Sequence, residues 1–267
     1  MNGVLVDLTK CIGCGSCTVA CKMYNDNKWV EDRSPTDGEK AVLADENWSV
    51  VRTCHVKNAE GQEVLRYVKE QCLHCKHPAC ESACPSRAFQ KTKAGPVLYY
   101  PRNCIGCRYC MIGCPFNIPK FEWDQTFAKM TKCMMCNERV INGEAPACVT
   151  VCPTNVMKFG GTEELLAEAK EIIANNPKYV QHIFGEEEAG GTNWIYISDV
   201  AFEDLGFRTR VPKQSLPHYT EKFMHLSPVV GGIWFAILWG LYFITRRNDV
   251  KAAEKKEEKT EKTETEA

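Results

Sequence analysis

The sequence lacks the short motifs by which most nucleotide-dependent and hydrolytic enzymes are identified. Its 267 residues contain no phosphate-binding Gly-x4-Gly-Lys loop, no dinucleotide fingerprint and no nucleophile elbow. They also lack an excess of positive charge, because 33 Lys and Arg residues stand against 34 Asp and Glu residues. Nucleic-acid-binding domains are usually strongly basic, so we expect no nucleic-acid partner. The sequence predicts no catalytic residue.

The N-terminus lacks the pattern of a secretory signal. Residues 1–10 contain no basic stretch followed by an apolar run, so we expect no export signal. Disulfide frameworks are typical of short secreted domains, and they therefore do not account for the 17 cysteines of this chain. Two explanations remain, structural zinc and iron–sulfur clusters.

Cysteines are arranged in four runs that use sixteen of the 17. The third run follows the bacterial ferredoxin pattern C-x2-C-x2-C-x3-C-P, in which the fourth cysteine binds the other cluster of a pair. The second and fourth runs share the closing x3-Cys-Pro, which zinc sites normally lack, so the pattern favours [4Fe–4S] clusters over zinc. The first run ends in Cys21-Lys22 instead.

A cysteine that binds a neighbouring cluster requires the runs to come in pairs. Residues 89–100 are typical of a strand–turn–strand connection, so the second and third runs form an inner pair. The first and fourth runs then form an outer pair around it. Repetition of Cys-Ile-Gly-Cys at residues 11–14 and 104–107 supports a duplication. The predicted ligand sets are Cys11, Cys14, Cys17 and Cys152 (set 1, cluster 1); Cys21, Cys133, Cys136 and Cys148 (set 2, cluster 2); Cys72, Cys75, Cys80 and Cys114 (set 3, cluster 3); and Cys84, Cys104, Cys107 and Cys110 (set 4, cluster 4).

These patterns predict an α+β fold of two nested two-cluster ferredoxin-like units with a single C-terminal transmembrane helix. The four-cluster region spans residues 1–160, with the inner pair at 72–115 inserted into the outer pair at 11–21 and 133–153. Residues 161–227 form an extension and linker. In it, Thr162 is expected to cap a helix and residues 193–198 to form a strand, both as scaffold.

An apolar stretch without charge lies at residues 228–245. At about 1.5 Å per residue it would cover roughly 27 Å, close to the thickness of a bilayer core. We expect it to cross the membrane and contact lipid, and the alternative is a docking helix. Arg246, Arg247 and the lysines after them favour a cytoplasmic tail and an outer, periplasmic cluster region, which would require export with a partner that carries a twin-arginine signal. Residues 246–267 are expected to be a charged, disordered tail.

Other residues near the runs are given structural roles. Cys54 belongs to no run and is expected to be a buried spare thiol. His74 and His77 are expected to pack or hydrogen-bond within a cluster loop. Five cations either ease cluster reduction or are ordinary surface charges: Lys76, Arg102, Arg108, Lys129 and Lys132.

Clusters held by four thiolates have no open iron site, so they transfer electrons. Four of them in one small region predict a path with an entrance and an exit. A zinc-binding scaffold for assembly and a redox sensor are the alternatives from other classes.

Taken together, these residues resemble the four-cluster iron–sulfur subunits of membrane-bound molybdopterin and hydrogenase complexes, above all the beta subunit of formate dehydrogenase. The resemblance covers about residues 4–245 and is strongest at residues 104–107, 113–119 and 144–148. It implies the same ligand sets and a non-catalytic subunit. That subunit would relay electrons between a catalytic molybdopterin-type or nickel–iron subunit and a membrane cytochrome b or quinone-reactive subunit. Hydrogenase-type relatives commonly carry an export signal, so the formate type is preferred.

Overall fold

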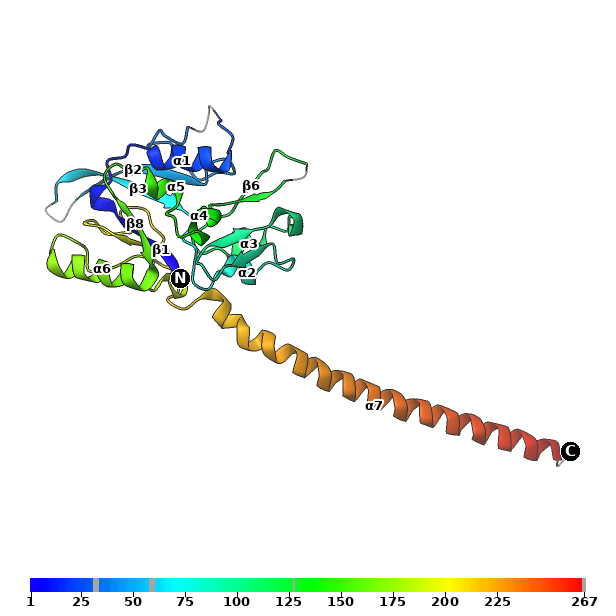
Figure 1. The fold of residues 1–267 in the computed structure, drawn as a ribbon. Helices are drawn as coiled ribbons and strands as arrows, with labels where there is room; N and C mark the ends of the chain where they lie inside the picture. Colours follow the sequence, from blue (N-terminus) through cyan, green and yellow to red (C-terminus); the bar gives the residue numbers. More distant parts are fainter. Residues whose placement is uncertain (31–33, 58–60, 127, 266–267) are drawn as a thin grey trace. The chain divides into compact units, whose positions relative to one another are not determined.

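The computed structural model describes residues 1–30, 34–57, 61–126 and 128–265. The chain divides into two units, Met1–Pro217 and His218–Ala267, and each is described by itself (Figure 1). All the cysteines lie in the first unit.

A three-stranded sheet organises the first unit. Its central strand is the N-terminal β1, which pairs antiparallel with β8 and parallel with β9, in the order β8-β1-β9. The sheet therefore joins the chain's beginning to the segment after the fourth cysteine run and to the extension. The strands are β1 (Asn2–Asp7), β8 (Met157–Gly161) and β9 (Trp194–Ile197).

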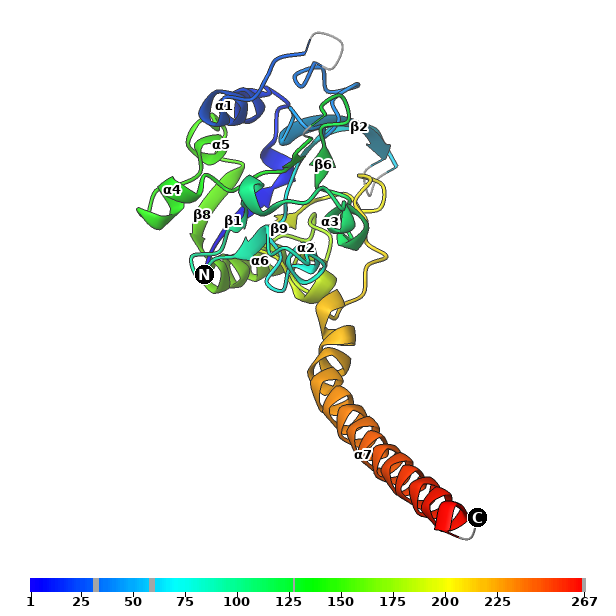
Figure 2. The same cartoon turned by 90° about the vertical axis from the view of Figure 1, so that its right-hand side faces the viewer.

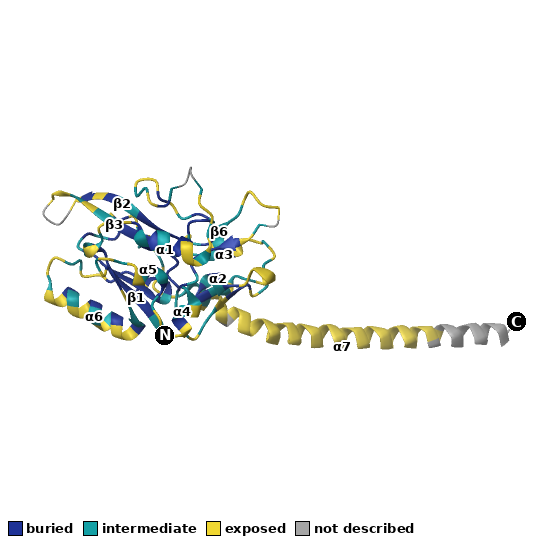
Figure 3. Cartoon of the chain, turned by 45° about the horizontal axis from the view of Figure 1, so that its top comes forward, coloured by how far each residue is buried: buried dark blue, intermediate teal, exposed yellow. Residues whose placement is uncertain are grey.

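One face of this sheet is covered by helix α6, Thr162–Asn175 (Figure 1). Leu165, Ala169 and Ile173 recur at helical spacing and are buried against Leu5 of β1 and the isoleucines of β9. In Figure 3 the helix accordingly alternates between buried and exposed positions. Burial of this stripe explains why the helix forms where the sequence predicts it.

The predicted cap of α6 is wrong. The N-cap position is occupied by Gly161, and Thr162 is already the first helical residue. Instead of capping, the Thr162 hydroxyl donates a hydrogen bond to the carbonyl oxygen of Met1 at 3.0 Å. The side chain that would have capped the helix therefore ties the first strand to it.

The other face of the sheet carries the main core. Val4 and Val6 alternate with Leu5 along β1, as residues on opposite faces of a strand must, and pack with Trp194 and Tyr196. Cys17, Met135 and Cys148 belong to the same core. The cysteine loops of the outer pair are thus built directly onto the sheet.

Three two-stranded hairpins lead into or between the cysteine runs. The longest ends at Gln71, immediately before Cys72. The expected strand–turn–strand between the inner runs is confirmed, and its turn needs Gly95, where φ is 127° and an added Cβ would lie 2.4 Å from the carbonyl oxygen of Asn2. The hairpins are β2 (Ser49–Lys57) with β3 (Glu63–Gln71), β4 (Phe89–Lys91) with β5 (Val97–Tyr99), and β6 (Lys120–Phe121) with β7 (Met130–Thr131).

Short helices form two pairs that carry several of the cysteines. Helix α1 packs against α5, which joins the first and fourth runs, and α2 packs against α3, which joins the second and third. Figure 2 shows the two pairs in separate parts of the unit. The paired helices are α1 (Ser16–Asn25) with α5 (Ala147–Thr150), and α2 (Ala79–Ser82) with α3 (Tyr109–Gly113). The described part of the unit also contains α4 (Asn137–Ile141) and the 3-10 turns Leu8–Lys10, Pro101–Asn103 and Glu188–Gly190.

Asn193 joins the inner and outer halves through its buried side chain. Its amide Nδ2 donates to the carbonyl oxygens of Asn2 (2.8 Å) and Gly95 (3.2 Å), and its backbone N–H donates to the carbonyl of Leu73 (3.1 Å). The extension therefore holds together segments that lie far apart in the sequence.

Asn193→Ala is expected to lower the free energy of unfolding by about 1–3 kcal/mol, because buried carbonyls lose their donor. Asn175→Ala, at an exposed position on α6, is the matched control and is expected to change stability by less than about 0.5 kcal/mol. The measurement is the midpoint of anaerobic guanidinium unfolding. Equal midpoints for the two variants would contradict the bridging role.

Helix α7 runs from Leu216 to Thr265, and from His218 onward it forms the second unit. Its segment Leu216–Ala253 is long and apolar enough to cross a membrane, and the described side chains from His218 onward are exposed (Figure 3). Rings stack along it at i,i+4 spacing, Phe235 on Trp239 at 5.4 Å and Trp239 on Phe243 at 5.6 Å. The helix continues through the expected disordered tail, whose sequence is rich in the strong helix formers Ala, Lys and Glu.

Candidate metal centres

The four cysteine runs share one local backbone feature. In each Cys-x2-Cys loop the residue before the second cysteine is left-handed: Gly13 (φ 71°), His74 (49°), Gly106 (68°) and Met135 (55°). Only two of these are glycines, although the conformation is unfavourable for other residues. The repetition shows that the four loops adopt the same tight turn.

A second repeated turn follows each Cys-Pro ending. Two residues after the proline the backbone is again left-handed, with φ between 51° and 54°, at Arg87, Asn117 and Asn155. This turn brings the next backbone N–H back to the cysteine sulfur in two of the three cases, from Ala88 to Cys84 (3.2 Å) and from Ile118 to Cys114 (3.5 Å). The first run, which lacks the proline, lacks this turn.

Backbone N–H groups directed at sulfur test whether these loops suit an iron–sulfur cluster. Such donors stabilise a negatively charged sulfur, which is the form that binds iron. Burial opposes ionisation of Cys84, yet donors from Ser86 and Ala88 lower the pKa of this thiol overall. Three further sulfurs accept a backbone N–H, Cys104 from Gly106 (3.4 Å), Cys133 from Met135 (3.3 Å) and Cys136 from Ala147 (3.5 Å). The loops therefore fit the group.

Sets 1 and 2 each line one cavity. The four cysteines of set 1 surround the first cavity, although Cys152 lies far along the chain from the others. Burial raises the pKa of Cys11 to about 11, and the charges of the other set 1 sulfurs add to the effect. The four cysteines of set 2 surround the second cavity, and burial raises the pKa of Cys21 to about 12. The structure thus brings both outer sets together.

Sets 3 and 4 are also brought together, as their electrostatics show. Burial raises the pKa of Cys75 well above its ordinary value, and the next contributions come from the other three sulfurs of set 3. Likewise, burial raises the pKa of Cys110 to about 12, followed by the charges of the other three sulfurs of set 4. In both sets the fourth cysteine of one run lies with three cysteines of the other.

Neighbouring sets approach each other in the order of their numbers. In addition to the larger effect of burial, a sulfur of one set raises the pKa of a sulfur of the next. The pairs are Cys17 with Cys148 between sets 1 and 2, Cys72 with Cys133 between sets 2 and 3, and Cys110 with Cys80 between sets 3 and 4. The order of the sets in space is therefore 1-2-3-4.

Exposure differs between the ends and the middle of this series. Cys14 of set 1 and Cys107 of set 4 are exposed, and every other cysteine is buried or half-buried. Around Cys107 the large apolar side chains Ile105, Tyr109 and Ile112 are exposed by 60–82%. The two terminal sets therefore reach the surface, and one of them does so within an apolar patch.

Two residues that line the outer cavities were not found by sequence reasoning. Lys69 of β3 lines the cavities of both set 1 and set 2. Trp194 of β9 lines the set 2 cavity, and its buried indole Nε1 has no hydrogen-bond partner within the described residues. The one sequence signal that could have pointed to Lys69 is its place in a strand that ends directly before Cys72. The extension thus contributes to a site and is more than scaffold.

His74 and the spare cysteine lie as expected, whereas nothing in the described structure supports the expected packing of His77. His74 is fully buried and its Nδ1 accepts a hydrogen bond from the backbone N–H of Val97 at 2.9 Å. Burial, with Lys132 and Lys91 nearby, holds the pKa of His74 well below its ordinary value. His77 is exposed. Cys54 is buried on β2, where Arg52 Nη1 donates to its sulfur at 3.5 Å.

The five cations near the runs differ in their surroundings. Lys132 is buried and donates to the carbonyl oxygens of Val97 and Cys133, the latter at 2.9 Å. Arg108 stacks on Phe121 and Trp123. Lys129 and Arg102 are exposed, and Lys76 is half-buried. Only Lys132 therefore lies inside the cluster region.

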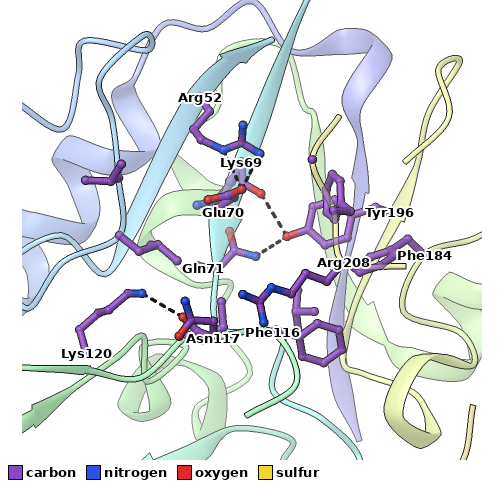
Figure 4. A pocket seen from close by; sticks show the side chains of 16 residues that line it. Arg52, Lys69, Glu70, Gln71, Phe116, Asn117, Lys120, Phe184, Tyr196 and Arg208 are labelled. Atoms are coloured by element: carbon purple, nitrogen blue, oxygen red, sulfur yellow. Dashed lines mark hydrogen bonds and ion pairs between the residues drawn. The ribbon is translucent and has the colours of Figure 1, made fainter. Parts of the chain in front are cut away.

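A cleft lies between β3 and the turn after Cys114 (Figure 4). Arg52 pairs with Glu70 at 2.6 Å, and Lys120 Nζ donates to the carbonyl oxygen of Asn117 at 3.0 Å. Arg208 also reaches into the cleft, beside Phe116. Positive side chains thus surround the turn that carries the last cysteine of set 3.

The sites define an iron–sulfur protein, and comparison with known proteins agrees. Residues 10–88 match one 4Fe-4S dicluster domain and residues 63–162 match another. A protein of Nitratidesulfovibrio vulgaris is 40% identical over 96% of this chain and 70% of its own length. Hydrogenase-2 operon protein HybA of Escherichia coli O157:H7 is 31% identical over 92% of this chain and 84% of its own. The iron–sulfur subunit of the nitrate-inducible formate dehydrogenase of Escherichia coli K12 is 36% identical over 72% and 66%.

The chain therefore belongs to the family of ferredoxin-type iron–sulfur subunits that includes HybA and the formate dehydrogenase subunit. It contains two dicluster domains with four [4Fe–4S] clusters, and it is an electron-transfer subunit and not a catalytic one. The resemblance inferred from the sequence is confirmed, and the zinc alternative is excluded.

Proposed function

We propose that this chain relays electrons along a series of four clusters between two redox partners that dock at opposite ends of the series. Sets 1 to 4 are the proposed ligands of clusters 1 to 4. The observation that carries the proposal is that only the terminal sets expose a cysteine, Cys14 at one end and Cys107 at the other. A relay needs access at its two ends and insulation between them.

The residues of the chain hold and tune the clusters. A [4Fe–4S] cluster with four thiolate ligands accepts and releases a single electron. The left-handed turns hold the sulfurs in place, and backbone N–H groups stabilise their negative charge. Around the interior sets, Lys69, Lys132 and His74 fill the space that water would otherwise occupy.

The proposed partners are a catalytic subunit and a membrane subunit of cytochrome b or quinone-reactive type. A molybdopterin formate dehydrogenase-type catalytic subunit is preferred, because the formate dehydrogenase relative has the higher identity of the two types, 36% against 31%. A nickel–iron hydrogenase is the second candidate, since the HybA match extends over 92% of this chain against 72%.

Helix α7 is the proposed single-pass anchor in the inner membrane, with lipid around residues 228–245. Arg246 and Arg247 at its apolar boundary favour a cytoplasmic tail, which gives the cluster region the outer, periplasmic face. Protease protection of the cluster region in spheroplasts would contradict this orientation.

The test is metal analysis of the complex, purified anaerobically in mild detergent through a tag on this chain. After the partners' own clusters and haem are subtracted, about sixteen iron atoms per chain are expected, as four [4Fe–4S] clusters require. Molybdenum or tungsten would support the preferred partner, and nickel would support the hydrogenase. Iron at half this level or below would contradict the four ligand sets.

A further inference from the structure

Lys69 occupies an unusual position for a lysine. Its side chain is only 1% exposed, and it lines both the cavity of set 1 and the cavity of set 2. It lies on β3, which ends at Gln71 directly before Cys72.

The surroundings of Lys69 offer it little charge compensation. Its ammonium donates to the hydroxyl of Ser49 and lies 5.6 Å from the ring centre of Trp194. Within the described ranges, no carboxylate forms an ion pair with it, and its neighbour Glu70 pairs with Arg52. A buried ammonium without a counter-charge is strongly destabilising, so a negative group is needed nearby.

With clusters bound, the sulfurs of both outer sets would supply that negative charge. Cys17 lines the first cavity together with Lys69, Cys21 and Cys148 line the second, and as cluster ligands these sulfurs would be thiolates. Cys17 belongs to set 1, and Cys21 and Cys148 belong to set 2. The same ammonium therefore faces both sets at the point where they approach each other.

We propose that Lys69 is a shared counter-ion of clusters 1 and 2, a positioning residue that raises the reduction potentials of both clusters together. The inference rests on the proposed ligand sets. A fixed positive charge favours the reduced, more negative form of a cluster, and it acts on both clusters because it lies between them. An electron that moves from cluster 1 to cluster 2 would therefore stay close to the Lys69 ammonium on both clusters.

The test is a potentiometric titration of Lys69→Met in the intact tagged complex, followed by electron paramagnetic resonance. Two of the four reduction steps of this chain are expected to shift to lower potential. The expected shift is at least tenfold in the equilibrium constant for reduction, which is about 59 mV for one electron. The other two steps are expected to stay in place.

Two variants serve as controls. Lys69→Arg keeps the charge and should retain the wild-type steps. Lys158→Met removes an exposed lysine of β8 that forms an ion pair with Glu168 at 2.7 Å. This variant should shift none of the four reduction steps. If Lys69→Met loses clusters while Lys69→Arg keeps them, the need for the charge is supported.

Three outcomes would overturn the proposal. These are unchanged potentials in Lys69→Met, a shift of all four steps, or loss of clusters in both Lys69 variants, which would mark a packing role. Iron content of the wild-type complex is measured in parallel. Too little iron there would count against the ligand sets themselves and not against Lys69.

Discussion

Cys114→Ser is expected to damage cluster 3 and to leave intact the cluster held by the other cysteines of its own run. Cys114 closes the third run in sequence, but its sulfur lies with Cys72, Cys75 and Cys80 of the second run. Iron should fall from about sixteen to between about twelve and fifteen atoms per chain. Electron transfer from one partner to the other should be nearly abolished, because set 3 lies between sets 2 and 4.

Paired variants make this test specific. The paramagnetic resonance spectrum of Cys114→Ser should match that of Cys75→Ser, while the spectrum of Cys84→Ser should match that of Cys107→Ser. Cys54→Ser is the control, because this cysteine lies apart on β2 and should keep the full iron content. A match between Cys114→Ser and Cys107→Ser would show that each run binds its own cluster, against the crossed sets proposed here.

Ending the chain after Pro217 is expected to release it from membranes. Expressed without its partner subunits, the full chain should sediment with membranes and resist an alkaline carbonate wash, because its apolar segment is long enough to cross a bilayer. The shortened chain should be recovered almost entirely in the soluble fraction. It should keep about sixteen iron atoms, since all the cysteines and the main core precede this position.

A chain ended after Asn248 is the matched control, since it keeps the apolar segment and Arg246 and Arg247 but loses the rest of the tail. It should remain in the membrane fraction. If the chain that ends at Pro217 still sediments with membranes in the absence of partners, the anchoring role of α7 is wrong.

Cysteine spacing made much of the candidate site predictable. A run of three close cysteines with a fourth one turn further on imposes a pairing of runs, and the short hairpin around Gly95 decides which runs are neighbours. The structure brings Cys152 beside set 1 and Cys114 beside set 3, as that pairing requires. Helix α6 was predictable for a similar reason, because its apolar residues recur at helical spacing.

What sequence could not show depends on contacts between distant segments. Thr162 is a residue type that often caps helices, but its hydroxyl donates a hydrogen bond to the carbonyl oxygen of Met1 instead. Lys69 is one charged residue among others along β3, and only its place in the lining of two cavities gives it a special position. Trp194 lies in a strand whose pattern indicates a buried scaffold, and its place beside set 2 follows from pairing with β1.

Because one pair of runs is nested inside the other, the cysteines of the two pairs emerge from the ribosome at different times. A ribosome releases the last proposed ligand of the inner pair, Cys114, well before Cys148 and Cys152 emerge. The inner clusters can therefore be inserted while translation continues, whereas the first run must wait, reduced and open, for partners that appear last. We therefore expect maturation to proceed from the inner pair to the outer pair, with the cysteines of the first run the most open to oxidation or to binding of another metal when iron is scarce.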